Sequence, residues 1–169
     1  MRFLALVGAL AIIVAIAAAI FFLGGFYNVA AIQEDPGVVN QALALVRTAS
    51  ISGHATDAPP ASFEDPKTVQ AGARAFSSRG CANCHGAPGV NWQKFADGMR
   101  PYPADLKDIA NSRTAPEIFW VVKNGIKMTG MPSFGSIGVP DDEIWTIAAL
   151  VKKWPSVSEA DYKTWTTAP

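Results

Sequence analysis

A stretch of 31 residues without a charged side chain begins at residue 3 and constrains the fold of this chain more than any other feature. Its first 21 residues, 3–23, are apolar apart from Gly8. As a helix, they would span about 31 Å, which matches the hydrocarbon core of a bilayer. No polar face interrupts the run, which argues against a buried helix of a soluble core. We therefore predict a transmembrane anchor or signal-anchor over residues 1–25.

The sequence favours a retained anchor but leaves a cleaved form open. A secretory signal usually has an apolar stretch of only about 7–15 residues, shorter than this one. The segment Val29-Ala30-Ala31 would nevertheless suit cleavage, which would release a soluble periplasmic protein. Arg2 precedes the run, and Glu34 and Asp35 follow it, which places the N-terminus in the cytoplasm. We expect a single-pass protein of the bacterial cytoplasmic membrane with its remaining domain in the periplasm.

The charge balance argues against nucleic-acid binding. Lys plus Arg is 14 and Asp plus Glu is 14, so the formal net charge is zero. A protein that neutralises phosphates needs a basic surface, and this composition does not supply one. The length of 169 residues suits a single folded domain beside the anchor.

Apolar periodicity predicts that the rest of the chain is all-α, since no segment alternates as a strand would. Capping residues, terminal glycines and charge placement mark the helix ends. The expected helices cover about 37–49, 65–80, 114–125 and 141–153, with a brief last helix from Ser158.

The remaining segments are predicted as linkers and loops. Residues 50–66 have the composition of a linker. Residues 86–112 lack a sustained period and are predicted as a long loop that a bound cofactor would organise. We expect a membrane-proximal helix and linker at 26–65, a folded domain at 66–155 and a C-terminal extension at 156–169.

The chemistry is concentrated in Cys81-Ala82-Asn83-Cys84-His85, a C-x-x-C-H sequence that holds both cysteines of the chain. Two thiols at this spacing can bond to the two vinyl groups of a haem, with the adjoining histidine as proximal iron ligand. A disulfide, a thiol-exchange pair or part of a zinc site are the alternatives. Zinc would usually need a second cysteine pair, and a thioredoxin-like site needs a βαβ pattern. We predict one covalent haem c on Cys81 and Cys84.

The second axial ligand of the iron must come from a methionine or from His54, and Met131 is the best candidate. Pro132 biases residue 131 toward an extended conformation, and Gly130 permits close approach of the backbone to a flat ring. Met99 and Met128 are interpreted as flexible core fillers. His54 is interpreted as a surface or linker residue, with a bis-histidine haem as the alternative.

Ligation by His85 and Met131 would raise the iron potential and fill its sixth site, which favours electron transfer. Several other side chains have both a haem-related and an ordinary interpretation. Trp92 and Tyr102 either line the macrocycle or pack in a loop. Arg100 either pairs with a haem propionate or is a solvated surface residue. The last pair, Lys123 and Lys127, either steers an acidic redox partner or is simply solvated.

These motifs resemble those of class I c-type cytochromes, specifically a membrane-anchored monohaem form. The resemblance covers residues 66–154: the helix before the C-x-x-C-H sequence, the segment 124–134 around Gly130-Met131-Pro132, and the helix that starts at 141. It implies a helical fold in which the first and last helices cross. The contacts implied for this crossing are made by Gly72 and Phe76 with Ile147 and Leu150. It also implies covalent haem c with His85 and Met131 as axial ligands.

The function expected from the resemblance is one-electron transfer outside the cytoplasmic membrane by a carrier that is not itself an enzyme. Its partners would be a dehydrogenase or quinol-oxidising complex and an oxidase or other acceptor. One alternative is an integral haem-relay subunit of a larger respiratory or dehydrogenase complex. A haem enzyme or gas sensor with a labile sixth ligand is a further alternative.

Overall fold

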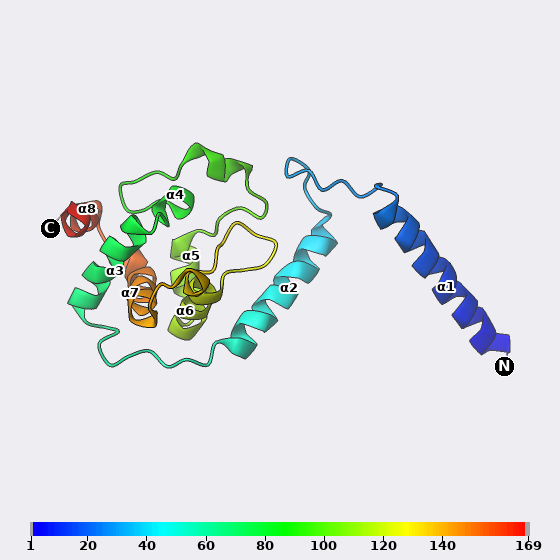
Figure 1. The fold of residues 1–169 in the computed structure, drawn as a ribbon, viewed down its shortest axis with the longest axis horizontal. Helices are drawn as coiled ribbons and strands as arrows, with labels where there is room; N and C mark the ends of the chain where they lie inside the picture. The colour runs from blue at the N-terminus through cyan, green and yellow to red at the C-terminus, as the bar shows by residue number, and fades with distance from the viewer. Residues whose placement is uncertain (1, 168–169) are drawn as a thin grey trace. The chain divides into compact units, whose positions relative to one another are not determined.

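The structure is a computed structural model that describes residues 2–167, and within this range it contains helices and connecting segments but no β-strand (Figure 1). The all-α prediction is confirmed. Backbone contacts divide the chain into two compact units that meet between Glu34 and Asp35. The first unit carries the apolar helix, and the second carries all predicted site residues.

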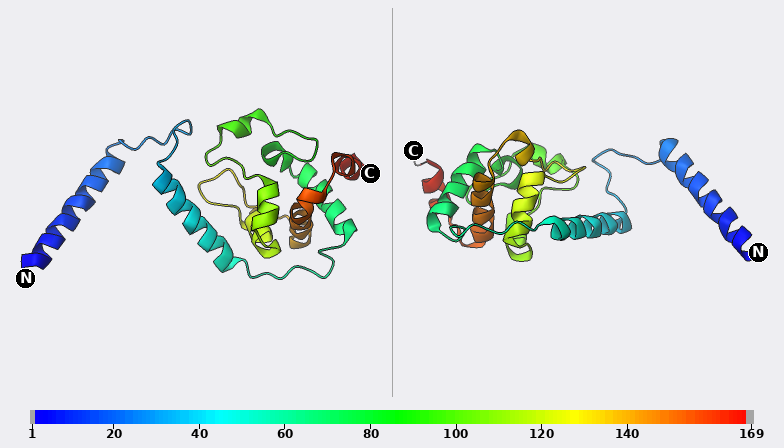
Figure 2. Two further views of the ribbon diagram at one scale, coloured as in Figure 1. Left: turned by 180° about the vertical axis from the view of Figure 1, so that it is seen from behind. Right: turned by 60° about the horizontal axis from the view of Figure 1, so that its bottom comes forward.

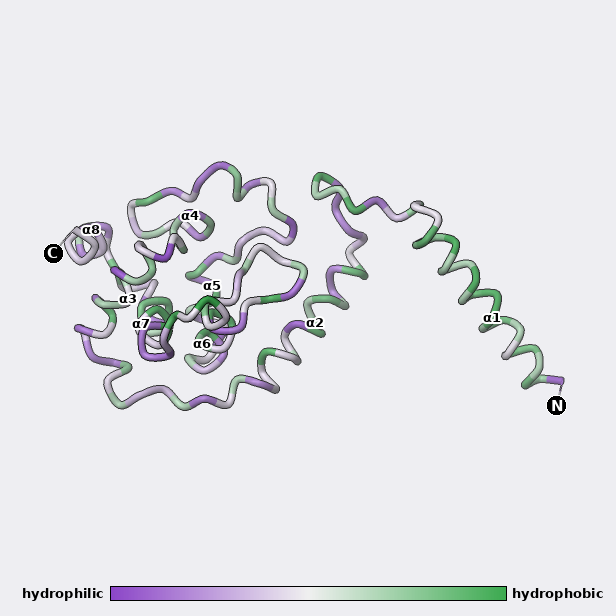
Figure 3. The backbone as a smooth tube through the Cα atoms, viewed as in Figure 1, coloured by the Kyte–Doolittle hydropathy of each residue, from purple (hydrophilic) through white to green (hydrophobic). Residues whose placement is uncertain are grey.

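The first unit is built around α1 (Arg2–Leu23), which is exposed along its whole length. Figure 3 shows apolar colouring along this helix up to its N-terminal end. Among the described residues, α1 is the one helix long and apolar enough to cross a membrane, although a signal sequence has the same character. The predicted anchor segment is therefore a continuous helix.

The core of the second unit forms where α7 (Asp141–Lys153) lies between α3 (Pro66–Ser78) and α6 (Ala115–Asn124), as Figures 1 and 2 show. One face of α7 is fully buried and includes Ile144, Ile147 and Leu150. The ring of Trp145 stacks on Phe119 of α6 with centroids 4.0 Å apart. Burial of these side chains supplies the main driving force for folding of this unit.

A glycine allows α3 and α7 to approach closely. A Cβ atom at Gly72 would overlap the carbonyl oxygen of Thr146 and lie 3.0 Å from Cβ of Leu150. Any larger side chain would push the two helices apart, since packed cores do not absorb extra volume freely. The crossing that the resemblance implied, with Gly72 facing Leu150, is confirmed.

The predicted helix ends agree with their capping residues. Asp65 accepts a hydrogen bond from the Lys67 backbone at 2.7 Å and caps α3. Thr114 and Glu117 form a reciprocal capping box at the start of α6. In α7, three acidic residues occupy the first turn and two lysines the last, which complements the helix dipole.

The membrane-proximal helix α2 (Gly37–His54) is five residues longer than the predicted range of 37–49. The assignment of residues 50–54 to a linker was wrong because tertiary contacts hold this last turn. Ile51 is buried, and Ser52 Oγ donates to Oε1 of Glu117 at 2.5 Å. Arg113 donates to Thr48 Oγ1 at 2.9 Å. These bonds attach α2 to α6.

The segment predicted as one long loop contains a 3₁₀ turn at Lys94–Gly98 and a short helix, α5 (Leu106–Ser112). The loop prediction was wrong for α5 because seven residues are too few to establish a period. Its last turn is stabilised by Lys152 of α7, whose Nζ donates to the carbonyl oxygens of Ala110 at 2.6 Å and Arg113 at 2.9 Å. Lysine at a helix C-terminus satisfies carbonyls that lack intrahelical partners.

The remaining elements are short. The expected last helix is present as α8 (Glu159–Thr167), where Ser158 Oγ accepts from the Asp161 backbone and Tyr162 is buried. α8 packs against α3. The other short elements are α4 (Ala82–His85) and two 3₁₀ turns at Gly135–Ile137 and Trp154–Ser156.

Candidate functional site

The C-x-x-C-H sequence forms a single helical turn directly after α3. Gly80, with φ +76°, ends the chain path of α3, and Cys81 has helical dihedral angles as the N-cap of α4. Gly86, with φ +66°, ends the turn. Side chains at i, i+3 and i+4 lie on one face of a helix. The local fold therefore places Cys81, Cys84 and His85 on the same face.

The imidazole of His85 has a fixed orientation. Its Nδ1 lies 2.9 Å from the carbonyl oxygen of Ala104, which can only accept a hydrogen bond. This contact assigns the proton to Nδ1 and leaves the lone pair of Nε2 for a metal. Burial lowers the pKa of His85, although the bond to Ala104 opposes the shift. The neutral imidazole that ligates iron is thus the favoured form.

The environment of Cys81 argues against thiol-exchange chemistry. Burial is the main cause that raises the pKa of this thiol to about 12. Reactive exchange cysteines have lowered pKa values because the thiolate is the nucleophile. The zinc alternative also lacks ligands, since no group of three or more His, Cys, Asp or Glu residues that could hold a metal occurs within residues 2–167.

A cavity of about 640 Å³ adjoins the motif. Its walls come from α4, the following loop, the segment Tyr102–Asp105 and the turn around Trp154. Trp92 and Tyr102 both line it, and Trp92 Nε1 donates to Asp97 at 2.8 Å. A second hollow of about 710 Å³ lies on α3 and α7 but contains none of the predicted site residues. The cavity beside His85 is the one that matches the motif chemistry.

Arg100 supplies an independent test of whether the site fits a haem. Its guanidinium lies 3.8 Å above the centre of the Tyr102 ring, and Nη1 donates to the carbonyl oxygens of Asp97 and Met99. Its Nε is buried without a hydrogen-bond partner among the described residues. A buried, unpaired cationic donor is costly unless a carboxylate accepts from it. A haem propionate has the required chemistry, so the residues present fit the group.

Met131 lies in a tightly closed loop between α6 and the turn at Gly135. The backbone amide of Ile126 donates to its carbonyl oxygen at 3.2 Å, and its own amide donates to Thr129 Oγ1 at 3.1 Å. The side chain is half-buried and packs against the hydrophobic core, as Cys81 also does. The loop therefore restricts where the thioether can lie.

The two other methionines near this loop differ sharply. Met128 is 97% exposed and has φ +58°, so its interpretation as a core filler was wrong. Met99 is half-buried, and its terminal methyl group occupies the space that a Cβ atom at Gly130 would need. Met99 thus packs directly against the residue that precedes Met131.

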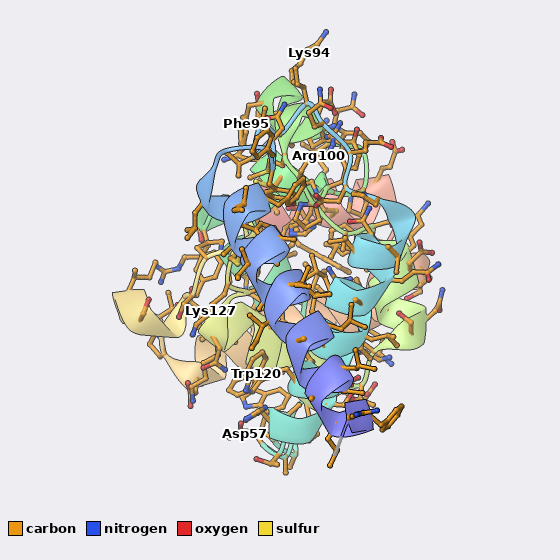
Figure 4. All side chains as sticks on the ribbon, turned by 90° about the vertical axis from the view of Figure 1, so that its right-hand side faces the viewer. Asp57, Lys94, Phe95, Arg100, Trp120 and Lys127 are labelled. Atoms are coloured by element: carbon orange, nitrogen blue, oxygen red, sulfur yellow. The ribbon has the colours of Figure 1, made fainter. Side chains whose placement is uncertain are left out.

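The structure places His54 away from the motif. It ends α2, accepts or donates at 2.7 Å to the Ser50 carbonyl through Nδ1, and lies beside the Trp120 ring. Figure 1 shows the C-terminal end of α2 well separated from α4. In Figure 4, Trp120 lies toward one end of the view, and Arg100, with the projecting Lys94, lies toward the other. His54 is a surface residue, as expected, but it belongs to a helix.

The two lysines considered for partner steering also differ. Lys123 Nζ is 2.7 Å from Asp141, so part of its charge is compensated within the domain. Lys127 is exposed, in the loop that leads to Met131. The sequence gave no signal for the role of Ala104, because its contribution is a backbone carbonyl.

Comparison with known families agrees with this geometry. The family model described as cytochrome c oxidase, cbb3-type, subunit III matches residues 67–151, which are 85 of the 169 residues. Neither the curated proteins nor the solved structures gave a significant match. The matched range begins in α3, includes the C-x-x-C-H turn and the Met131 loop, and ends in α7. The chain belongs to this family of c-type cytochrome domains.

Proposed function

We propose that this protein is a membrane-tethered electron carrier with one covalent haem c, His85 and Met131 as axial ligands, and its haem domain on the periplasmic side. One observation carries the proposal. The α4 turn presents two thiols and an imidazole on one face, and Ala104 fixes that imidazole with Nε2 available. One C-x-x-C-H sequence and two cysteines support a single haem.

Each residue has a distinct part in this function. The haem, when bound, supplies an iron that gains or loses one electron. Cys81 and Cys84 hold it covalently, and the bond from His85 to Ala104 keeps the proximal ligand in one orientation. Met131 occupies the sixth position, raises the potential and excludes small molecules. Arg100 neutralises a propionate in the buried part of the site.

The test is a reduced-minus-oxidised visible spectrum of the purified protein with a pyridine haemochrome assay. We expect a c-type spectrum with one haem per chain and the weak sulfur-to-iron band near the red edge. A haem spectrum without that band, together with ready binding of carbon monoxide by the ferrous protein, would favour the gas-sensor alternative. Absence of covalent haem would contradict the proposal.

The electron partners are proposed by class. A dehydrogenase or quinol-oxidising complex would donate electrons, and an oxidase or other acceptor would receive them. The description of the family as an oxidase subunit favours a second candidate, an integral haem-relay subunit of a larger complex. Stoichiometric co-purification with partner subunits in detergent would support that candidate, whereas transient, salt-dependent reduction would support the carrier.

A further inference from the structure

Helix α2 has one face attached to the haem domain and an opposite face that the second unit leaves uncovered. The attached side carries Thr48, Ile51 and Ser52, which contact α6 and its N-terminal residues. Helical spacing places a second set of side chains on the other side. These are all apolar: Val38, Val39, Ala42, Leu43, Leu45, Val46 and Ala49.

The uncovered face is unusually apolar for a solvent-facing helix. Leu45 is 72% exposed, Val46 is 67% exposed, and Val38 and Leu43 are also exposed. In a water-soluble helix, the side that faces away from the core normally carries polar and charged residues. A contiguous exposed apolar surface marks an interaction site. Something other than water is therefore expected to cover it.

Chain connectivity indicates what lies within reach. Only 13 residues, 24–36, join the end of α1 to the start of α2. Fully extended, they span at most about 47 Å. The same linker carries the exposed apolar residues Phe26, Val29 and Ile32, with Phe26 where an interfacial aromatic would follow a membrane span. If α1 crosses a bilayer, α2 is always close to the surface of that bilayer.

The charge pattern of α2 suits a lipid surface. The helix contains no Asp or Glu, and its ionisable side chains are Arg47 and His54. Insertion of its outer face into the headgroup region would therefore bury no carboxylate. Arg47 would be attracted to anionic lipid headgroups.

We propose that α2 lies along the membrane surface with its outer face, from Val38 to Ala49, buried in the lipid interface. Through Thr48 and Ser52 this helix then holds the haem domain in a fixed orientation, rather than leaving it free on a flexible tether. The inference rests on α1 as a retained anchor and is independent of haem ligation. It goes beyond a carrier that is merely tethered, because it restricts which partners the domain can face.

The test is photocrosslinking of the full chain in vesicles of phosphatidylcholine and phosphatidylglycerol. In one variant p-benzoylphenylalanine replaces Val46, and in the matched control it replaces Lys163, an exposed residue of α8. We expect lipid adducts at least several-fold more abundant at position 46 than at position 163. Similar yields at the two positions, or a crosslink at 46 mainly to a second copy of the chain, would overturn the proposal.

Two further measurements keep the outcome interpretable. The intact mass of the purified protein shows whether α1 is retained; a cleaved form would refute the anchor while leaving the haem assignment untouched. The same crosslinking in native membranes distinguishes lipid from a partner protein. A dominant adduct with one membrane protein at position 46 would replace the lipid surface as the occupant and overturn the proposal.

Discussion

The two sides of the candidate haem site are built in different ways. On the α4 side, three consecutive helical positions, Cys81, Cys84 and His85, are brought to one face by a single turn. On the opposite side, Met131 depends on a loop closed by Ile126 and Thr129. The first arrangement is local in sequence and the second is tertiary. The α4 side should therefore tolerate distant changes better than the Met131 side.

The largest expected effect is on the α4 side. Replacing both cysteines, Cys81→Ser with Cys84→Ser, should abolish covalent haem, because no other cysteine is present. Acid extraction of the purified protein, followed by haem staining, measures this directly. Haem that stays attached to the double variant after extraction would refute the attachment assignment.

The second effect separates the two sides. Met131→Ala should leave haem attached through α4 but remove the sixth ligand and lower the potential by on the order of tenths of a volt, since axial ligands control haem potentials over a wide range. Potentiometric titration measures the shift, and carbon monoxide binding reports the open position. The matched control is Met128→Ala, a change at an exposed methionine of the same loop. An unchanged potential in Met131→Ala would reject this ligand.

A smaller change tests whether packing positions the Met131 loop. Gly130→Ala should displace Met99, whose methyl group occupies the required space. Overpacking of this kind costs about 1–3 kcal/mol, so we expect a lower unfolding midpoint and a weakened sulfur-to-iron band. The control is Gly98→Ala, where a Cβ would meet nothing within 4 Å. Equal behaviour of the two variants would show that Met99 does not constrain the loop.

What could be predicted from sequence follows the same division. The C-x-x-C-H turn and the helices around it are specified by residues that are close in sequence, such as Thr114 with Glu117. The misassigned regions depend on distant contacts: the last turn of α2 needs Glu117, and α5 is held by Lys152. The acceptor for His85 is a backbone carbonyl 19 residues away, which no side-chain pattern identifies.

The exposed Met128 has a similar explanation. Hydrophobicity alone favoured burial, but the short loop between α6 and Met131 turns residue 128 outward with φ +58°. Loop geometry, not side-chain character, determined its position. Sequence reasoning fails where a few backbone angles decide which side chain points inward.

The helix that leads into the Met131 loop offers a pH test. Burial opposes ionisation of Glu117, but hydrogen bonds from Ser52 and Thr114, supported by Arg113, lower its pKa below the ordinary value of 4.5. A lowered folded-state pKa stabilises the fold above pH 4.5, and this contribution is lost as the pH falls through the folded-state value. Glu117→Gln should cost about 1.5–3 kcal/mol near pH 7, and less as the pH drops below 4.5. Chemical denaturation at pH 7 and below 4.5 measures both; a constant difference would contradict the assignment.

The smallest effect is expected from the long-range contact nearest the α4 side. Arg79, two residues before Cys81, donates to Glu143 of α7 at 2.7 and 3.0 Å, and this bond lowers the pKa of Glu143. Both side chains are substantially exposed, so solvent screens the pair. Glu143→Gln should therefore leave the haem spectrum and the potential unchanged, with a smaller loss of stability near pH 7 than Glu117→Gln. A spectral change in Glu143→Gln comparable to that of Gly130→Ala would mean that the α4 turn also depends on tertiary support, and the contrast between the two sides would fail.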